Sequence, residues 1–260
     1  MLLAIDVGNT ETKLGVFEGR SDKLVHHWRV TTESKRTADE YGVFFTQLFA
    51  TAGLKAREIS AVAIASVVPR LDHTLADVCE KFFAVKPHFL SPESQTLIRI
   101  LTDRPAEVGA DLVACAIGAC ARYGAPLIVA SYGTASVFTA ISAQGEYLGV
   151  AIAPGINISI DALALRTAKL PQVAFAPPER AIGRNTIEAL QSGIIHGFVG
   201  QTEAIVARIR AEMNVDARVV ATGGLSETIA QHTKVIDIVD PHLGLVGLQL
   251  FYATTSEARR

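Results

Sequence analysis

The sequence is poor in cysteine, tryptophan and surplus positive charge, and each shortage excludes a class of protein. Its 260 residues contain three cysteines and one tryptophan. So few cysteines cannot form a disulfide framework, which favours a reducing compartment, the cytoplasm. The 24 Lys and Arg residues are balanced by 26 Asp and Glu residues, for a formal net charge of −2. Because a broad cationic field is missing, no nucleic-acid partner is expected.

Long hydrophobic runs are also missing. The apolar start from Met1 to Ile5 is interrupted by Asp6, and later apolar stretches are broken by polar residues or glycine. We therefore expect no signal peptide, no membrane span and no membrane partner. What the chain has in quantity is apolar residues, 49% of the total. They suffice for a substantial core, in one large unit or in two ordinary domains.

Strand and helix patterns alternate along the chain, which is typical of an α/β protein. Near the N-terminus, three strands joined by short turns predict an antiparallel meander over residues 2–5, 12–17 and 24–30. A capping box from Thr37 to Glu40 then predicts the start of a helix. Further helices are predicted at about 71–83, 108–123, 157–168, 186–213 and 242–252, and further strands at 61–68, 126–130, 135–141, 147–152, 218–221 and 235–238.

The order strand, small-residue turn, strand, turn, strand occurs twice. Asp6 and Ser131 stand just before or within the two small-residue turns and lie 125 positions apart, close to half the chain. We therefore expect a duplicated architecture with domains at 1–115 and 116–260. Each would hold a mixed sheet flanked by helices, with a cleft between the two halves for a ligand.

The most informative segment runs from Asp6 to Lys13 and reads Asp-Val-Gly-Asn-Thr-Glu-Thr-Lys. Its glycine lets the turn approach a ligand closely, and its amides and hydroxyls can hold phosphate oxygens. The Asp6 carboxylate can hold Mg²⁺ through water, and Lys13 can meet phosphate charge. Taken alone, the same residues also fit an ordinary hairpin whose Asp and Thr side chains satisfy backbone groups.

Three further segments place polar groups or glycines at helix starts. Gly109-Ala110-Asp111 puts a carboxylate in the first turn of a helix, as a general base for a hydroxyl or as a simple helix-end charge. Gly223 and Gly224 follow a predicted strand and either leave room for a base or sugar or serve the turn alone. Before Thr186, Asn185 is either an N-cap or a ligand contact.

Taken together and in order, segments over almost the whole chain resemble the type III pantothenate kinases. That family belongs to the sugar kinase, heat-shock ATPase and actin superfamily. The resemblance rests on Asp6–Thr10, Arg36–Tyr41, Ser66–Pro69, Glu107–Asp111, Gly133–Ala135, Ala153–Ile156, Lys169–Pro171, Ile182–Thr186 and Ala221–Gly224.

The resemblance implies two ribonuclease-H-like (actin-like ATPase) domains, an intertwined homodimer, ATP, Mg²⁺ and a monovalent cation, K⁺ or NH₄⁺. The reaction it implies is ATP-dependent phosphorylation of pantothenate to 4′-phosphopantothenate, the first step of coenzyme A biosynthesis. It assigns Asp111 as the general base, Asp6 as the Mg²⁺ ligand and Ser131 to the region of the monovalent cation. The implied ATP and phosphate contacts are Asp6, Val7, Gly8, Asn9, Thr10, Lys13, Gly133, Thr134, Gly223 and Gly224. The implied acceptor contacts are Gly109, Ala110, Asp111, Leu112, Gly155 and Thr186, the last from the neighbouring subunit.

The chain departs from the family pattern at four positions. Leu112 stands where the family generally has arginine, which removes a fork suited to the pantothenate carboxylate, and we expect the affinity for pantothenate to be about ten- to a hundredfold lower as a result. Ser131 and Thr139 replace aspartates, and Thr102 replaces a tyrosine near the acceptor. Two alternatives to an active pantothenate kinase therefore stay open. One is an impaired paralogue that binds nucleotide or a pantothenate-like ligand in a regulatory role; the other is a kinase for another small hydroxyl compound.

Overall fold

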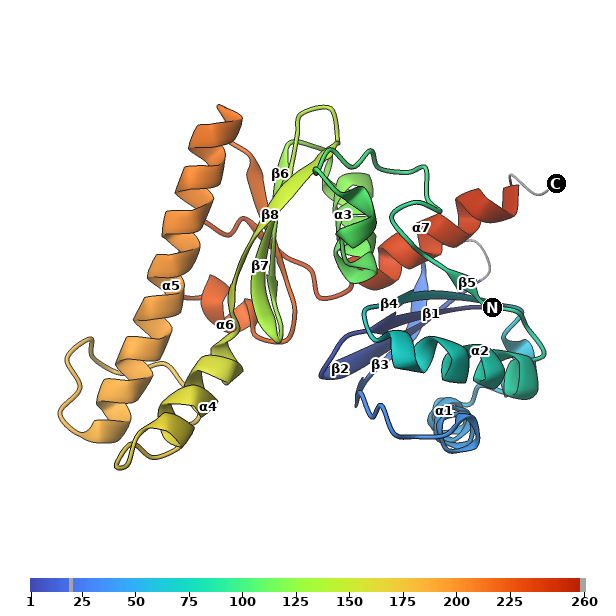
Figure 1. The fold of residues 1–260 in the computed structure, drawn as a ribbon, viewed down its shortest axis with the longest axis horizontal. Helices are drawn as coiled ribbons and strands as arrows, with labels where there is room; N and C mark the ends of the chain where they lie inside the picture. Colours follow the sequence, from blue (N-terminus) through green and yellow to red (C-terminus); the bar gives the residue numbers. More distant parts are fainter. Residues whose placement is uncertain (19–20, 258–260) are drawn as a thin grey trace. The chain divides into compact units, whose positions relative to one another are not determined.

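The computed structural model describes residues 1–18 and 21–257, which fold into two compact units (Figure 1). Unit 1 comprises Met1–Arg122 and the C-terminal segment from His242, and unit 2 comprises Tyr123–Pro241. The division expected from the sequence, 1–115 and 116–260, differs from these units in two ways. Residue 115 lies inside helix α3 (Ala110–Tyr123), whose continuous backbone hydrogen bonds hold it in one piece, and helix α7 (Leu243–Glu257) returns to unit 1.

Unit 1 is built on a mixed sheet with strand order β3-β2-β1-β4-β5. β1 (Leu2–Val7), β2 (Glu11–Phe17) and β3 (Leu24–Thr31) form the antiparallel meander predicted from the sequence. β4 (Ala61–Ser66) and β5 (His88–Phe89) extend the sheet with parallel pairing. β1 is buried along its whole length and β4 nearly so, as expected for apolar strands in the middle of a sheet.

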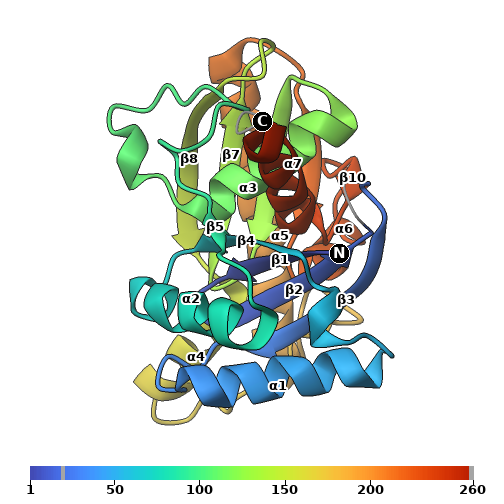
Figure 2. The same ribbon diagram turned by 90° about the vertical axis from the view of Figure 1, so that its right-hand side faces the viewer.

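Helices cover both faces of this sheet (Figure 2). α1 (Ala38–Thr51) and α2 (Pro69–Phe83) enclose a core with the inward side chains of β1, β2 and β4. Thr37 accepts the Glu40 N–H while the Glu40 carboxylate accepts the Thr37 N–H, which confirms the predicted capping box. α7 packs against β1 and β4. Because strand side chains alternate, the neighbours of α7 lie on the face away from α1 and α2. Two short 3₁₀ helices lie at Ala56–Glu58 and Pro105–Glu107.

Unit 2 repeats this plan with strand order β10-β9-β6-β7-β8. Its strands are β6 (Leu127–Tyr132), β7 (Ala135–Ile141), β8 (Tyr147–Pro154), β9 (Arg218–Thr222) and β10 (Ile238–Val239). Two expectations were wrong in detail. β6 continues through Ser131, which was assigned to the turn, because backbone pairing to β7 and β9 extends past it. β10 begins later than the apolar pattern at 235–238 suggested, because pairing to β9 covers only Ile238 and Val239.

One face of the second sheet packs against α4 (Ile156–Arg166), α5 (Thr186–Met213) and the short α6 (Ser226–Ala230). α5 has the bounds predicted from the sequence, because Asn185 caps its start by accepting the Glu188 N–H. Among the residues that the structure describes, no helix is both long and apolar enough to cross a membrane.

The two sheets have the same strand order and directions, so the duplicated architecture expected from the sequence is present. Asp6 and Ser131 are each the fifth residue of a six-residue strand. Asp6 pairs with Lys13 in the next strand, whereas Ser131 pairs with Val137. The charged pair of the first half therefore has an uncharged counterpart in the second half.

Candidate active site

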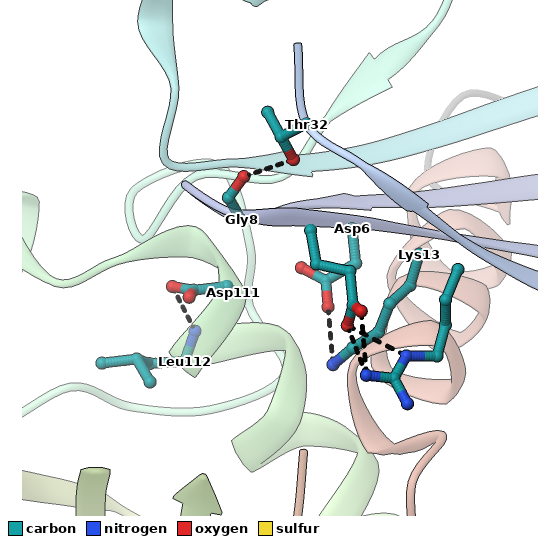
Figure 3. Close-up of polar contacts among 8 residues, drawn as sticks. Asp6, Gly8, Lys13, Thr32, Asp111 and Leu112 are labelled. Atoms are coloured by element: carbon teal, nitrogen blue, oxygen red, sulfur yellow. Dashed lines mark hydrogen bonds and ion pairs between the residues drawn. The ribbon is translucent and has the colours of Figure 1, made fainter. Parts of the chain in front are cut away.

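The site in unit 1 begins with a buried ion pair between neighbouring strands. Asp6 of β1 and Lys13 of β2 are paired in register, so their side chains leave the sheet on the same face. The Lys13 Nζ lies 3.7 Å from Asp6 Oδ2 (Figure 3). Asp6 is only 6% exposed. The antiparallel register of the first hairpin thus brings together the two charges that the sequence analysis assigned to phosphate and metal binding.

Burial and mutual attraction govern the pKa values of this pair. Burial raises the pKa of Asp6, and the Lys13 ammonium opposes that rise. Burial pulls the pKa of Lys13 down, but the charges of Asp6, Cys115 and Glu11 outweigh it and leave the pKa of Lys13 above its ordinary value. Lys13 is therefore a firmly charged ammonium in a protected place, which is the property required for holding phosphate.

The loop between these strands is held from two sides. The Gly8 N–H donates to the Glu11 carbonyl at 3.0 Å, and a Cβ on Gly8 would lie 2.9 Å from that oxygen, so the turn requires glycine. The Thr32 hydroxyl donates to the Gly8 carbonyl at 2.7 Å (Figure 3). Val7, in contrast, turns its side chain into the core, so only its backbone is available to a ligand. Thr32 is not among the residues predicted from the sequence, where its one signal is its place directly after the third strand of the meander.

Asp111 lies in the first turn of α3, as predicted. Its Oδ1 accepts the Leu112 N–H at 2.8 Å (Figure 3). The Gly109 carbonyl accepts the N–H groups of Leu112 and Val113 and so opens the helix. A Cβ on Gly109 would lie 2.5 Å from Asp111 Oδ1, so glycine leaves room for the carboxylate. Ala110 is buried and Leu112 is half-buried.

Burial raises the pKa of Asp111 to about 6, and the nearby Asp6 carboxylate adds to the rise. The Leu112 N–H and Lys13 oppose the rise without cancelling it. A carboxylate that served only as a helix-end charge would be expected to have a lowered pKa, because the helix N-terminus favours its ionised form. The opposite shift is the one that tunes a carboxylate for general-base catalysis near neutral pH.

Helix α7 packs against this site through glycines. This packing was not predicted from the sequence. A Cβ on Gly244 would lie 3.0 Å from Asp6 Oδ2 and 3.5 Å from Cys115 Sγ. Farther along, a Cβ on Gly247 would lie 1.9 Å from the Ala114 carbonyl oxygen. Backbones this close leave no room for side chains, which explains why α7 belongs to unit 1 with α3 rather than to unit 2.

In unit 2, three glycine positions meet around one turn. A Cβ on Gly155 would lie 2.1 Å from the Thr134 carbonyl oxygen and 2.6 Å from that of Gly133. Gly223 has a φ of +96°, and a Cβ there would lie 2.4 Å from the Tyr132 carbonyl oxygen. The fold therefore brings together residues that the sequence analysis had assigned separately to phosphate, adenosine and acceptor.

The remaining positions predicted from the sequence range from exposed to fully buried. Thr186, the first residue of α5, and Gly224 are exposed. Ser131 is half-buried beside Val137 and Thr222 in the sheet register. Thr139 is 2% exposed, and the Thr102 hydroxyl oxygen is buried without a hydrogen-bond partner in the described part of the chain. Asn185 is an N-cap, the plainer of its two interpretations.

Comparison with known proteins decides the family. The sequence profile of the type III pantothenate kinases matches residues 2–208. The chain is 48% identical over 252 residues to the type III pantothenate kinase of Myxococcus xanthus (strain DK1622), covering 97% of this chain and 98% of that protein. The chain belongs to the type III pantothenate kinase family. It is also 44% identical over 259 residues to the family member of Geobacillus kaustophilus (strain HTA426), with 100% of both chains covered.

Family membership confirms the resemblance seen in the sequence. The kinase is a phosphotransferase whose activity is the ATP-dependent phosphorylation of pantothenate in coenzyme A biosynthesis. Solved structures support the fold alone. The activator of 2-hydroxyisocaproyl-CoA dehydratase from Clostridium difficile, with bound ADPNP, aligns with a TM-score of 0.59 at 12% identity over 99% of this chain and 96% of that one. The inorganic polyphosphate/ATP-glucomannokinase from Arthrobacter sp. strain KM aligns with a TM-score of 0.51 at 14% identity over 98% of both chains. These likenesses confirm the two-domain sugar kinase and actin-like ATPase fold.

Proposed function

We propose that Asp111 is the general base that takes the proton from the primary hydroxyl of pantothenate as it attacks the γ-phosphoryl group of ATP. The observation that carries this assignment is a half-buried carboxylate whose pKa is raised to about 6 beside the Asp6–Lys13 pair. Above that pH the carboxylate is ionised and can accept a proton. The raised pKa makes it a stronger proton acceptor than an ordinary aspartate as the attacking hydroxyl loses its proton in the transition state, and such help contributes about 10²–10⁴-fold to rate.

We propose phosphate contacts in each unit, taken by itself. In unit 1, Lys13 supplies positive charge to the phosphates, and the loop from Gly8 to Thr10 supplies backbone and hydroxyl groups. In unit 2, Gly133 and Thr134 form the second phosphate loop, and Gly223 and Gly224 leave room for the adenosine. Positioned charge and dipoles of this kind provide most of the catalysis in phosphoryl transfer, because the reacting groups need little covalent help.

The residues of unit 1 fit a Mg²⁺ ion. In the described residues, no group of three or more His, Cys, Asp or Glu side chains forms a metal cage. Mg²⁺ bound with nucleotide usually takes one or two carboxylates, and the phosphates and waters complete its shell. Asp6 meets this requirement, with Asp111 close enough for the two charges to interact. When bound, the ion would neutralise phosphate charge; Asp6 would hold it while Lys13 balances the carboxylate.

Ser131 offers K⁺ or NH₄⁺ a neutral hydroxyl in place of a carboxylate. Ser131 is neutral, and its neighbours in the sheet register are Val137 and Thr222. The equivalent place in unit 1 holds the Asp6 carboxylate. We therefore assign no step of the reaction to a monovalent cation in this kinase.

The residues proposed to contact pantothenate, which accepts the phosphoryl group, are Gly109, Ala110, Leu112 and Gly155, with Thr186 supplied by a neighbouring subunit. Leu112 is the half-buried apolar neighbour of the proposed base. It gives the pantothenate carboxylate no partner, so binding relies on other groups. We expect weaker pantothenate binding than in relatives that carry arginine there, with the chemical step preserved.

We propose that the kinase is a homodimer that pairs through unit 2. A groove of about 400 Å³ between α4 and α5 is lined by apolar side chains that include Leu163, Leu190 and Phe198. A Cβ on Gly193 or Gly197 would meet nothing within 4 Å, so another helix can approach this face closely. Pairing here would cover apolar surface beside the start of α5, where Thr186 lies.

We also propose a cytoplasmic location for the kinase. All three cysteines are thiols rather than disulfides, and both this and the use of ATP support the proposal.

Leu163→Asp is expected to convert this dimer to monomers. A charge in the apolar groove would lose its hydration on pairing, so the dissociation constant should rise by at least about tenfold. Light scattering coupled to size exclusion measures the mass directly. The control is Val43→Asp, at a 62% exposed apolar residue on α1, which should stay dimeric. A monomeric parent protein at micromolar concentration would contradict the proposal.

The proposed activity is tested by a coupled assay of ADP release with and without pantothenate. Turnover that requires pantothenate and is lost in Asp111→Asn is the expected result, with equal rates in Na⁺ and K⁺ buffers. Nucleotide binding without transfer would indicate the impaired, regulatory paralogue. Transfer only to other hydroxyl compounds would indicate a kinase with a different acceptor.

The Leu112→Arg variant should lower the KM for pantothenate about tenfold or more, because it restores a charged contact.

A further inference from the structure

One residue outside the recognised motifs holds both ends of the first phosphate loop. Thr32 directly follows β3, and its backbone N–H donates to the Thr10 carbonyl at 2.9 Å. Its hydroxyl donates to the Gly8 carbonyl at 2.7 Å (Figure 3). The carbonyl oxygens at the two ends of the segment from Gly8 to Thr10 are therefore both directed at Thr32.

A second threonine sets the direction of the hydroxyl bond. Thr12 Oγ1 lies 2.8 Å from Thr32 Oγ1. A carbonyl oxygen can only accept, so the Thr32 hydroxyl hydrogen is committed to Gly8, and Thr12 must donate to Thr32. Thr12 is 2% exposed, so water does not replace this partner easily. The result is a chain of two hydrogen bonds, from Thr12 to Thr32 and from Thr32 to the Gly8 carbonyl, in which each bond polarises the next.

The hydrogen bonds from Thr12 through Thr32 to Gly8 matter for an anionic ligand, because carbonyl oxygens repel phosphate. A loop that binds phosphate must turn its carbonyl oxygens away and present N–H groups, hydroxyls or cations. We propose that Thr32 is a positioning residue for the nucleotide phosphates, which keeps the Gly8 and Thr10 carbonyls turned away from the ligand. This inference rests on the proposed assignment of the Gly8–Thr10 loop to phosphate binding.

The hairpin itself does not need the Thr32 hydroxyl. The turn is already closed by the Gly8 N–H, which donates to the Glu11 carbonyl at 3.0 Å. β2 and β3 are in register from Glu11 opposite Thr31 onward, and the Thr32 N–H continues that pairing. The hydroxyl bond adds to these only the orientation of the Gly8 carbonyl, so its loss should affect ligand binding more than folding.

The test compares three variants of the full-length protein. Thr32→Val keeps the shape of the side chain and removes the hydroxyl, while Thr32→Ser keeps the hydroxyl. Thr46→Val is the matched control, because the part-buried Thr46 hydroxyl also donates to a glycine carbonyl, that of Gly42, at 2.9 Å within α1. The readout is the Kd of a non-hydrolysable ATP analogue with Mg²⁺, measured by calorimetry, together with the KM values for ATP and pantothenate.

Thr32→Val should raise the Kd and the KM for ATP about tenfold, the effect of losing two hydrogen bonds in the chain. The KM for pantothenate should stay unchanged, Thr32→Ser should lie within about twofold of the parent, and Thr46→Val should match the parent. Unchanged ATP affinity in Thr32→Val, an equal loss in Thr46→Val, or no rescue by serine would each overturn the proposal. A parent protein that binds the analogue but transfers nothing to pantothenate would refute the proposed function alone, since the binding readout still judges Thr32.

Discussion

Asp111→Asn is expected to lower kcat by about 10²–10⁴-fold while the affinity for ATP stays within a few fold of the parent protein. Asparagine has nearly the shape of aspartate and can still accept the Leu112 N–H, which the carboxylate accepts at 2.8 Å. It cannot take a proton from a hydroxyl. The loss should therefore fall on the chemical step, and single-turnover kinetics with saturating ATP and pantothenate measures it.

The same substitution should stabilise the protein above neutral pH. Burial raises the pKa of Asp111 from 3.8 to about 6 in the folded state, so between these values the folded state holds a proton that the unfolded state has released. That contribution to stability is complete below the unfolded pKa and is lost as pH rises through about 6. Asparagine removes the charge, so the free energy of unfolding at pH 8 should rise by roughly 1–3 kcal/mol.

Two measurements separate this outcome from general damage. In the parent protein, kcat/KM should rise with pH through about 6, the pKa of the proposed base. Urea unfolding at pH 5 and pH 8 should show that the stabilisation by Asp111→Asn is larger at pH 8. Asp77→Asn, at an exposed position on α2, is the control and should change neither quantity. Activity close to that of the parent in Asp111→Asn would refute the assignment of the base.

Lys13→Met is expected to weaken ATP binding by about 10²–10³-fold. Methionine keeps most of the aliphatic stem but removes the ammonium, which lies 3.7 Å from Asp6 Oδ2 and is proposed to face the phosphates. Truncating one member of a buried charge pair costs about 2–5 kcal/mol in a binding site, and each 1.4 kcal/mol is about tenfold in affinity. Calorimetry with a non-hydrolysable ATP analogue measures the change.

The stability of Lys13→Met should also depend on pH. Without the ammonium, the buried Asp6 carboxylate is an unpaired charge, and leaving one charge of a buried pair alone typically destabilises by about 3–5 kcal/mol. The penalty should shrink as pH falls, because the raised pKa of Asp6 lets it take up a proton. Asp6→Asn in the same background should restore stability without restoring ATP binding.

A surface lysine is the matched control for this experiment. The Lys23 Nζ lies 2.9 Å from Glu18 Oε2, and the two side chains are 70% and 60% exposed. Exposed pairs of this kind contribute about 0–1 kcal/mol, so Lys23→Met should change neither stability nor ATP affinity appreciably. If Lys13→Met bound ATP as tightly as Lys23→Met does, the phosphate assignment of Lys13 would fail.

Much of the fold was predictable because its signals are local. The meander of β1 to β3, the capping box at Thr37 and the bounds of α5 all follow from neighbouring residues, and all were predicted correctly. Errors arose where pairing with a distant strand decided the outcome. Ser131 extends β6 because β7 and β9 pair past it, and β10 begins later than its apolar pattern because only Ile238 and Val239 meet β9.

The sequence by itself determined the family, the order of the elements and the chemical types of the site residues, since these depend on residue identity and spacing. Only the tertiary structure decided three further properties. Burial beside Asp6 raises the pKa of Asp111, close glycine packing returns α7 to the first unit, and Thr32, directly after β3, reaches the Gly8 carbonyl. Each depends on groups far apart in the chain, whose desolvation, steric fit or hydrogen bonding exists only once the chain is folded.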